Sequence, residues 1–110
     1  MGHHKFAGEY SGKFNQTVVE GGKITLSKGK ATLTITEVGK GAYLITTVEN
    51  GSTTFNDLAY LEDNVLRAQA QTGEGITSTY FENKDLIHQS SEKSPTTWKV
   101  KNYKLKYCKH

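Results

Sequence analysis

The stretch KATLTITEVGKGAYLITTVENGSTTF, residues 30–55, contains the pattern that decides the fold. Its first eight residues alternate, with aliphatic side chains on one face of a strand and threonines on the other. The aliphatic set is Ala31, Leu33 and Ile35. Further along, Asn50-Gly51 is typical of a type I′ turn, because both central residues of that turn need positive φ. The stretch therefore predicts antiparallel strands joined by tight turns.

The same alternation and turn chemistry continue in both directions, and no segment holds a helical period. The predicted strands cover residues 5–19, 23–27, 30–37, 42–49, 53–61, 65–71, 76–82, 85–91 and 96–107. An up-and-down meander of this kind must roll up to bury one face and remove its edges. We expect an all-β fold in which eight or nine strands form a small closed or nearly closed barrel, with a two-sheet sandwich as the alternative.

Length and composition bound the organisation of the chain. Its 110 residues predict a single domain over 1–110, in which residues 1–4 are expected to be disordered or tag-like. The single cysteine, Cys108, excludes an intrachain disulfide and a cysteine-based metal site. The sequence contains no apolar stretch long enough to predict a transmembrane helix, and its N-terminus lacks the apolar core of a signal peptide. A cytoplasmic protein is expected, with a mature secreted fragment as the open alternative.

The opening segment FAGEYSGKF and the closing aromatic and basic strand carry a family resemblance. With Gly8-Glu9-Tyr10 as the counterpart of a Gly-x-Trp or Gly-x-Tyr element, the chain resembles the calycin group of lipocalins, fatty-acid-binding proteins and avidins. The strands-only layout of avidins fits best, although a single tryptophan does not match a biotin pocket. The resemblance implies a barrel that holds a small ligand.

Arg67, in NVLRAQAQT, is the first candidate ligand-binding residue. Arg67 and Gln69 share one face of the predicted strand, and Leu66 and Ala68 share the other. If the Arg67 face looks inward, it suits a ligand carboxylate or phosphate, as the interior arginine of fatty-acid-binding calycins does. If Leu66 and Ala68 face inward, the polar residues face water.

Further candidates follow the same face logic. Tyr80 offers a hydroxyl to a ligand, and His88 is either a ligand contact or a histidine with a local hydrogen bond. The aliphatic walls of the ligand site are expected from Leu33, Ile35 and Leu44. No second histidine lies at metal spacing, so neither a metal site nor a cofactor is expected.

The C-terminal segment WKVKNYKLKY, residues 98–107, is strongly basic. Residues 93–110 contain six lysines and no acid. A β-bulge at Asn102 would place every large apolar side chain inside the barrel and every lysine outside. The lysines that could then contact an anionic partner are Lys99, Lys101, Lys104 and Lys106.

Three hypotheses for function follow. The first is a non-enzymatic binding protein that holds a small apolar or amphipathic ligand inside the barrel. The second is a protein- or nucleic-acid-interacting barrel that uses the basic C-terminal strand. The third is an enzyme on a calycin-like scaffold, which no nucleophile, metal or phosphate-loop motif of this sequence favours.

Overall fold

The computed structural model describes residues 6–69 and 74–108, except the side chains of Thr53, Gln69 and Glu74. The tag-like residues 1–4 and the end of the strand predicted to reach residue 71 lie outside this description. The strands are β1 (Gly8–Glu20), β2 (Lys23–Gly39), β3 (Ala42–Glu49), β4 (Thr53–Glu62), β5 (Val65–Gln69), β6 (Glu74–Glu82), β7 (Asp85–Lys93) and β8 (Thr97–Tyr107).

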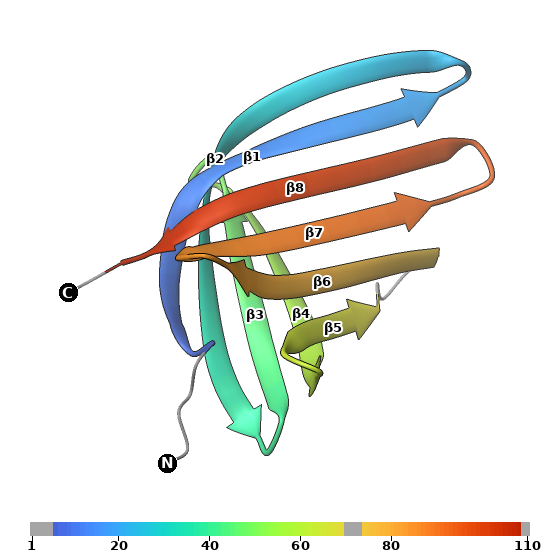
Figure 1. Ribbon diagram of the computed structural model, residues 1–110. Helices are drawn as coiled ribbons and strands as arrows, with labels where there is room; N and C mark the ends of the chain where they lie inside the picture. The colour runs from blue at the N-terminus through green and yellow to red at the C-terminus, as the bar shows by residue number, and fades with distance from the viewer. Residues whose placement is uncertain (1–5, 70–73, 109–110) are drawn as a thin grey trace.

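Each strand pairs with its sequence neighbour in antiparallel fashion, and β8 closes the barrel on β1 (Figure 1). The predicted all-β meander barrel is therefore confirmed. The Asn50-Gly51 turn has φ values of 52° and 75°, as its sequence predicts. No helix among the described residues is long and apolar enough to cross a membrane.

The predicted break between the strands at residues 23–27 and 30–37 is wrong, because β2 runs through both ranges as one strand. Its register with β1 is continuous, and Gly29 lies opposite Phe14. A Cβ at Gly29 would lie 2.9 Å from Cε1 of Phe14 and also against the side chain of Asn50. Gly29 therefore serves close packing inside a strand rather than chain reversal.

The bulge predicted at Asn102 is also wrong. The pairing of β8 with both β1 and β7 keeps one register along its whole length. With unbroken alternation, Lys101 shares the inner face with Tyr103 and Leu105 and is buried with them. Trp98 lies on the outer face and is exposed.

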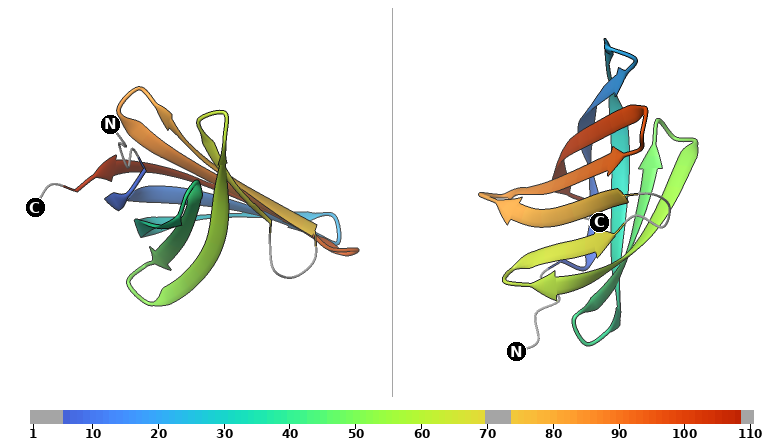
Figure 2. Two further views of the ribbon diagram at one scale, coloured as in Figure 1. Left: turned by 90° about the horizontal axis from the view of Figure 1, so that it is seen from below. Right: turned by 90° about the vertical axis from the view of Figure 1, so that its right-hand side faces the viewer.

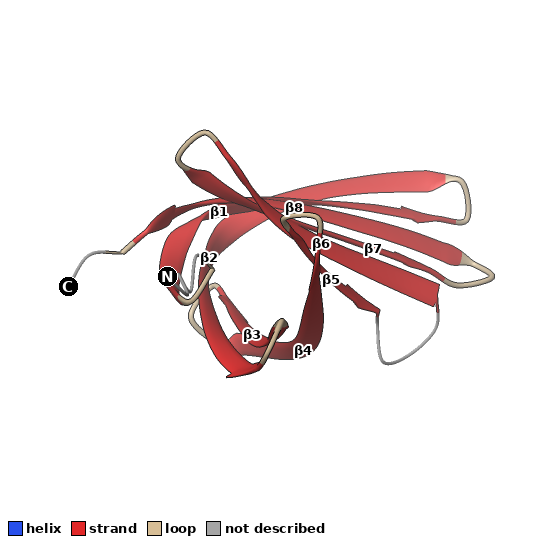
Figure 3. Cartoon of the chain, turned by 60° about the horizontal axis from the view of Figure 1, so that its bottom comes forward, coloured by secondary structure: helices blue, strands red, loops and turns tan. Residues whose placement is uncertain are grey.

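The molecule has a barrel at one end and a flat extension at the other, with overall extents of 50 × 25 × 25 Å (Figures 1 and 3). The extension consists of the ends of the long strands, and we call it the arm. It comprises residues 15–20 and 23–28 of the first hairpin and residues 89–93 and 97–102 of the last. The arm has two faces, one of which continues the inner surface of the barrel.

The end of the barrel away from the arm is filled with apolar side chains. The Phe6 ring stacks on Phe81 with centroids 5.1 Å apart, and the Tyr10 hydroxyl donates a 2.8 Å hydrogen bond to the Phe6 carbonyl. Burial raises the pKa of Tyr10 to about 12, so this hydroxyl keeps its proton. The barrel core also contains six completely buried aliphatic side chains, those of Leu33, Ile35, Ile45, Leu66, Leu86 and Leu105.

Candidate functional site

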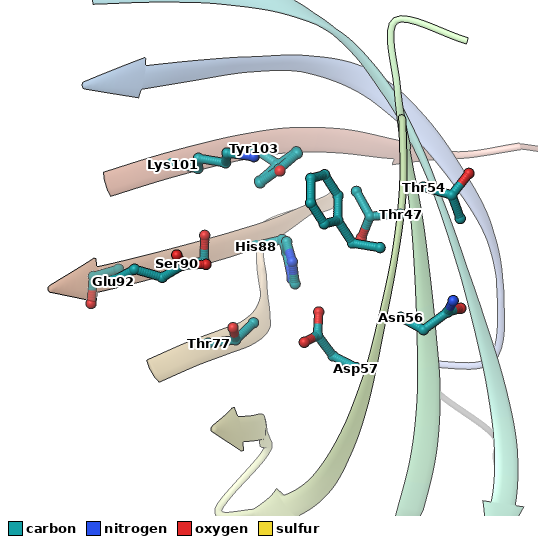
Figure 4. A pocket seen from close by; sticks show the side chains of 12 residues that line it. Thr47, Thr54, Asn56, Asp57, Thr77, His88, Ser90, Glu92, Lys101 and Tyr103 are labelled. Carbon is teal, nitrogen blue, oxygen red and sulfur yellow. The ribbon is translucent and has the colours of Figure 1, made fainter. Parts of the chain in front are cut away.

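The barrel opens toward the arm because two of its strands diverge. β4 and β5 pair only over residues 60–62 and 65–67, and Figure 2 shows them separating beyond their hairpin. A cavity of about 300 Å³ lies at this opening (Figure 4). It is lined by Thr47, Thr54, Phe55, Asn56, Asp57, Thr77, His88, Ser90, Ser91, Glu92, Lys101 and Tyr103.

Lys101, in one wall of this cavity, forms a buried ion pair with Glu49 behind the wall. The Lys101 ammonium lies 2.9 Å from Oε2 of Glu49, and the Tyr103 hydroxyl donates a hydrogen bond to the same oxygen. The ammonium also lies 4.5 Å from the centroid of the Phe55 ring, a cation–π contact. Burial and the carboxylate of Glu49 raise the pKa of Tyr103 far above its ordinary value. The charge of Lys101 is thus balanced within the protein.

His88 is buried beside this pair, with its Nδ1 atom 2.6 Å from the Thr79 hydroxyl oxygen. Its ring meets Tyr103 edge to face, with centroids 5.0 Å apart. Burial, and secondarily the charge of Lys101, lower the pKa of His88 to about 4. The imidazole is therefore neutral at pH 7, and Figure 4 shows it pointing into the cavity.

Asp57 supplies a carboxylate to the opposite wall. It lies in β4 opposite Ile45, on the inner face of the barrel. Partial burial, and secondarily the charge of Glu92, raise the pKa of Asp57. Within residues 6–69 and 74–108, no hydrogen bond or ion pair joins the Asp57 side chain to another group.

Thr47 adds an unsatisfied hydroxyl to the same cavity. Its Oγ1 atom is buried and has no hydrogen-bond partner among the described residues. Buried polar atoms are nearly always hydrogen-bonded, because burial without a partner costs about 1–3 kcal/mol. An unpaired atom in a cavity wall marks a place where a bound molecule can donate or accept a hydrogen bond.

The site residues predicted from sequence fall in different parts of the molecule. His88 lines the cavity, whereas Leu33 and Ile35 belong to the filled apolar core. Leu44 faces outward, because its neighbours Tyr43 and Ile45 occupy the inner face of β3.

The structure also shows which face of the strand around Arg67 points into the barrel. Leu66 and Ala68 are buried, and Arg67 is exposed on the outer surface, paired with Tyr60 across β4 and β5. Tyr80 has the same outward phase on β6, and the side chain of Gln69 lies outside the described residues. The structure therefore does not gather Arg67, Tyr80 and His88 around one space.

The lysines of β8 divide between two faces. Lys99 and Lys101 lie on the inner face, whereas Lys104 and Lys106 face outward. The two outward lysines flank Asp85, with Nζ to carboxylate oxygen distances of 3.7 Å and 2.9 Å. Their proximity lowers the pKa of Asp85.

Sequence reasoning missed Thr47, Asp57 and Glu49, and it placed Lys101 on the outer face, although Lys101 is buried and lines the cavity. A usable signal existed in the alternation itself. Thr47 and Glu49 continue the inward phase of Tyr43 in β3, and Lys101 continues that of Tyr103. If the inward positions of each strand are counted onward to its polar residues, these residues fall at the open end of the barrel, which we call the barrel mouth.

A comparison with protein-family models finds no matching family, and a comparison with curated proteins finds no match. Among solved structures, the fold is similar to that of a protein of unknown function from the DUF3598 family of Nostoc punctiforme. The TM-score is 0.50 at 10% sequence identity, and the match covers 94% of this chain and 48% of that chain. This chain thus spans about half the length of that protein. The likeness shows the fold alone, and the calycin resemblance stays a prediction.

Proposed function

We propose that the protein is a non-enzymatic binding module whose barrel mouth holds a small amphipathic molecule carrying a protonated amine. The observation that carries this proposal is the Asp57 carboxylate, which faces the cavity without a cationic partner among the described residues. A buried or half-buried carboxylate is stabilised by an adjacent cation, and an ammonium group supplies one.

The charges around the cavity favour a cation over an anion. Asp57 and Glu92 both contribute carboxylates to the lining. Lys101, the one lysine among the described residues of the lining, is already neutralised by Glu49. A carboxylate or phosphate ligand, which an inward Arg67 would have suited, would meet two like charges and no unpaired cation among the lining residues that the structure describes.

The remaining lining residues suit the other parts of an amphipathic molecule. The Phe55 ring at the rim is 41% exposed and offers an apolar face. The Thr47 hydroxyl offers a hydrogen bond from inside the cavity. A volume of about 300 Å³ lies at the small end of the range of ligand sites. These features support a ligand with one ring or short chain beside its amine.

Binding rather than catalysis is supported by the position of the Thr79 hydroxyl. The contact between Thr79 and His88 places a hydroxyl beside a potential base, an arrangement found in nucleophilic catalysis. The side chain of Thr79 is completely buried, however, and does not line the cavity. A substrate in the cavity therefore cannot reach it.

The test compares phenethylamine with phenylacetate, two molecules of similar size and opposite charge, by isothermal titration calorimetry at pH 7. We expect the amine to bind more tightly, and Asp57→Asn to weaken its binding at least tenfold, since a lost charge-assisted contact is worth about 1.5–3 kcal/mol. Asp63→Asn, in the exposed β4–β5 turn, is the matched control. Tighter binding of the acid, or equal affinity in Asp57→Asn, would contradict the proposal.

A further inference from the structure

The outer face of the arm, together with the barrel wall where the arm begins, is ordered in rows that cross the strands. The strand registers align Lys30, Lys13 and Lys104 in one row, which we call the lysine row. Further toward the arm tip, two rows are largely apolar, and we call them the apolar rows. They contain Leu26, Thr17 and Val100, followed by Ile24, Val19 and Trp98.

The apolar rows are unusually exposed. Leu26 is 74% exposed, Ile24 is 65% exposed and Trp98 is 52% exposed. Ile76 of the adjoining β6 is exposed beside them, since it pairs with Ser91 and Ser91 pairs with Val100. Single exposed apolar residues are ordinary, but a contiguous apolar patch marks an interaction surface.

The lysine row is a second and independent sign of a partner. Lys13 lies directly opposite Lys30 on one side and Lys104 on the other, and all three are exposed. Like charges directly opposite across strands destabilise a sheet. Among the described residues, neither Lys13 nor Lys30 forms an ion pair that would offset this repulsion. A negatively charged surface that covers the row would offset it.

The order of the rows fits an arm that rests at a tilt on a lipid surface, with the apolar rows at its tip deepest and the lysine row higher, among the headgroups. A row of amides and one lysine, Lys28, Asn15 and Asn102, separates the lysine row from the first apolar row. At about 3.4 Å per residue, the lysine row lies roughly 14 Å from the first apolar row. Amphipathic surfaces bury their apolar side about 5–10 Å into the headgroup and acyl boundary, while lysines attract anionic headgroups.

We propose that the outer face of the arm docks on a membrane surface rich in anionic phospholipids. The apolar rows enter the boundary between headgroups and acyl chains, where the amphipathic ring of Trp98 is favoured. The lysine row lies among the phosphates. The inner face of the arm stays in water, in keeping with its exposed polar residues, including Glu20, Lys23 and Glu92.

A second copy of the chain fits this face less well. Two arms packed face to face in parallel would place one lysine row against the other. Packed in antiparallel fashion, each lysine row would lie over the apolar rows of the other copy. The first arrangement is repulsive, and the second removes water from unpaired ammonium groups, which is costly.

The test uses the only tryptophan of the chain as the reporter. Vesicles of phosphatidylcholine with about 30% phosphatidylserine are compared with pure phosphatidylcholine vesicles, at about 50 mM and about 500 mM salt. We expect a blue shift of Trp98 emission and co-flotation with the anionic vesicles, weakened at least tenfold by the higher salt. No binding to anionic vesicles, or equal binding to neutral ones, would overturn the proposal.

Two variants separate the contributions of the rows. Ile24→Ser/Leu26→Ser and Lys13→Gln/Lys30→Gln are each expected to weaken vesicle binding at least tenfold, since both pairs are exposed and their replacement leaves the core intact. The matched controls lie elsewhere on the barrel surface and are expected to bind within about twofold of the unmodified protein. They are Leu44→Ser/Leu58→Ser and Lys40→Gln/Lys84→Gln.

Other partners give distinguishable outcomes. Binding to duplex DNA at low salt without binding to vesicles would overturn the membrane proposal in favour of a nucleic acid. Self-association in sedimentation velocity that Ile24→Ser/Leu26→Ser abolishes, without vesicle binding, would overturn it in favour of a second copy. Both outcomes are independent of amine binding in the cavity, so the two proposals stand or fail separately.

Discussion

Thr47 places a hydroxyl in the cavity wall where no described group forms a hydrogen bond with it. Thr47→Val removes the unsatisfied atom and keeps the shape of the side chain. We expect the free energy of unfolding to rise by about 1 kcal/mol, and amine affinity to fall a few-fold. Urea unfolding and calorimetry measure the two effects, and Thr34→Val on the exposed face of β2 is the control. A destabilised Thr47→Val would contradict this account.

His88 gives the stability of the protein a defined pH dependence. Its pKa falls from the ordinary 6.5 to about 4 in the folded state, so the unfolded chain takes up the proton first as the pH falls. Stability is therefore lost between about pH 6.5 and pH 4, by about 3 kcal/mol for this group. The charged neighbour on β8 is Lys101, and its repulsion of a protonated imidazole acts in the same direction.

The measurement is urea unfolding at pH 7 and at pH 4 for the unmodified protein and for His88→Gln. Glutamine does not titrate. Between pH 7 and pH 4, the free energy of unfolding of His88→Gln should therefore fall by about 3 kcal/mol less than that of the unmodified protein. The difference between the proteins removes the contribution of Asp57, whose raised pKa acts in the opposite direction. Parallel losses of stability in both proteins would rule out His88 as the source.

At the scale of the elements, β1 and β8 approach closely at Gly12. A Cβ there would lie 3.0 Å from Cα of Leu105 and would also strike the carbonyl oxygen of Lys104. We expect Gly12→Ala to lower the free energy of unfolding by about 2 kcal/mol or more, because backbone must move to accept it. Gly39→Ala is the matched control, since its Cβ would be 3.7 Å from the nearest atom. Equal urea midpoints for the two variants would contradict this expectation.

The positions of the strands followed from period-two alternation and turn residues, and the errors have specific causes. Gly29 lies in the segment SKGK, whose composition is typical of a turn. In the structure it lies opposite the Phe14 ring of the neighbouring strand, and alternation within one strand does not reveal that contact. The bulge predicted at Asn102 depends on the assumption that lysines avoid the interior. Lys101 is inside because Glu49, from a distant strand, neutralises it.

At the scale of the whole molecule, the sequence predicts the barrel, but of the described residues that it predicts for the ligand site only His88 lines the cavity. His88 was identified because its phase relative to Leu86 could be followed within one strand. Lys101 and its partner Glu49 come from strands far apart in sequence, as do Asp57 and the nearby charge of Glu92, so these groups meet only after the barrel closes. Sequence alternation assigns each side chain to a face, but it does not say which faces meet at the mouth.

The pairing of the first strand with the last has a consequence for synthesis. On the ribosome, β1 emerges before the other described strands, and its partner β8 emerges after all of them. Until β8 is released, one long edge of β1 and one of β7 stay unpaired. The nascent chain therefore carries open strand edges for the whole interval between the synthesis of β1 and that of β8, a period in which it is exposed to pairing with other chains.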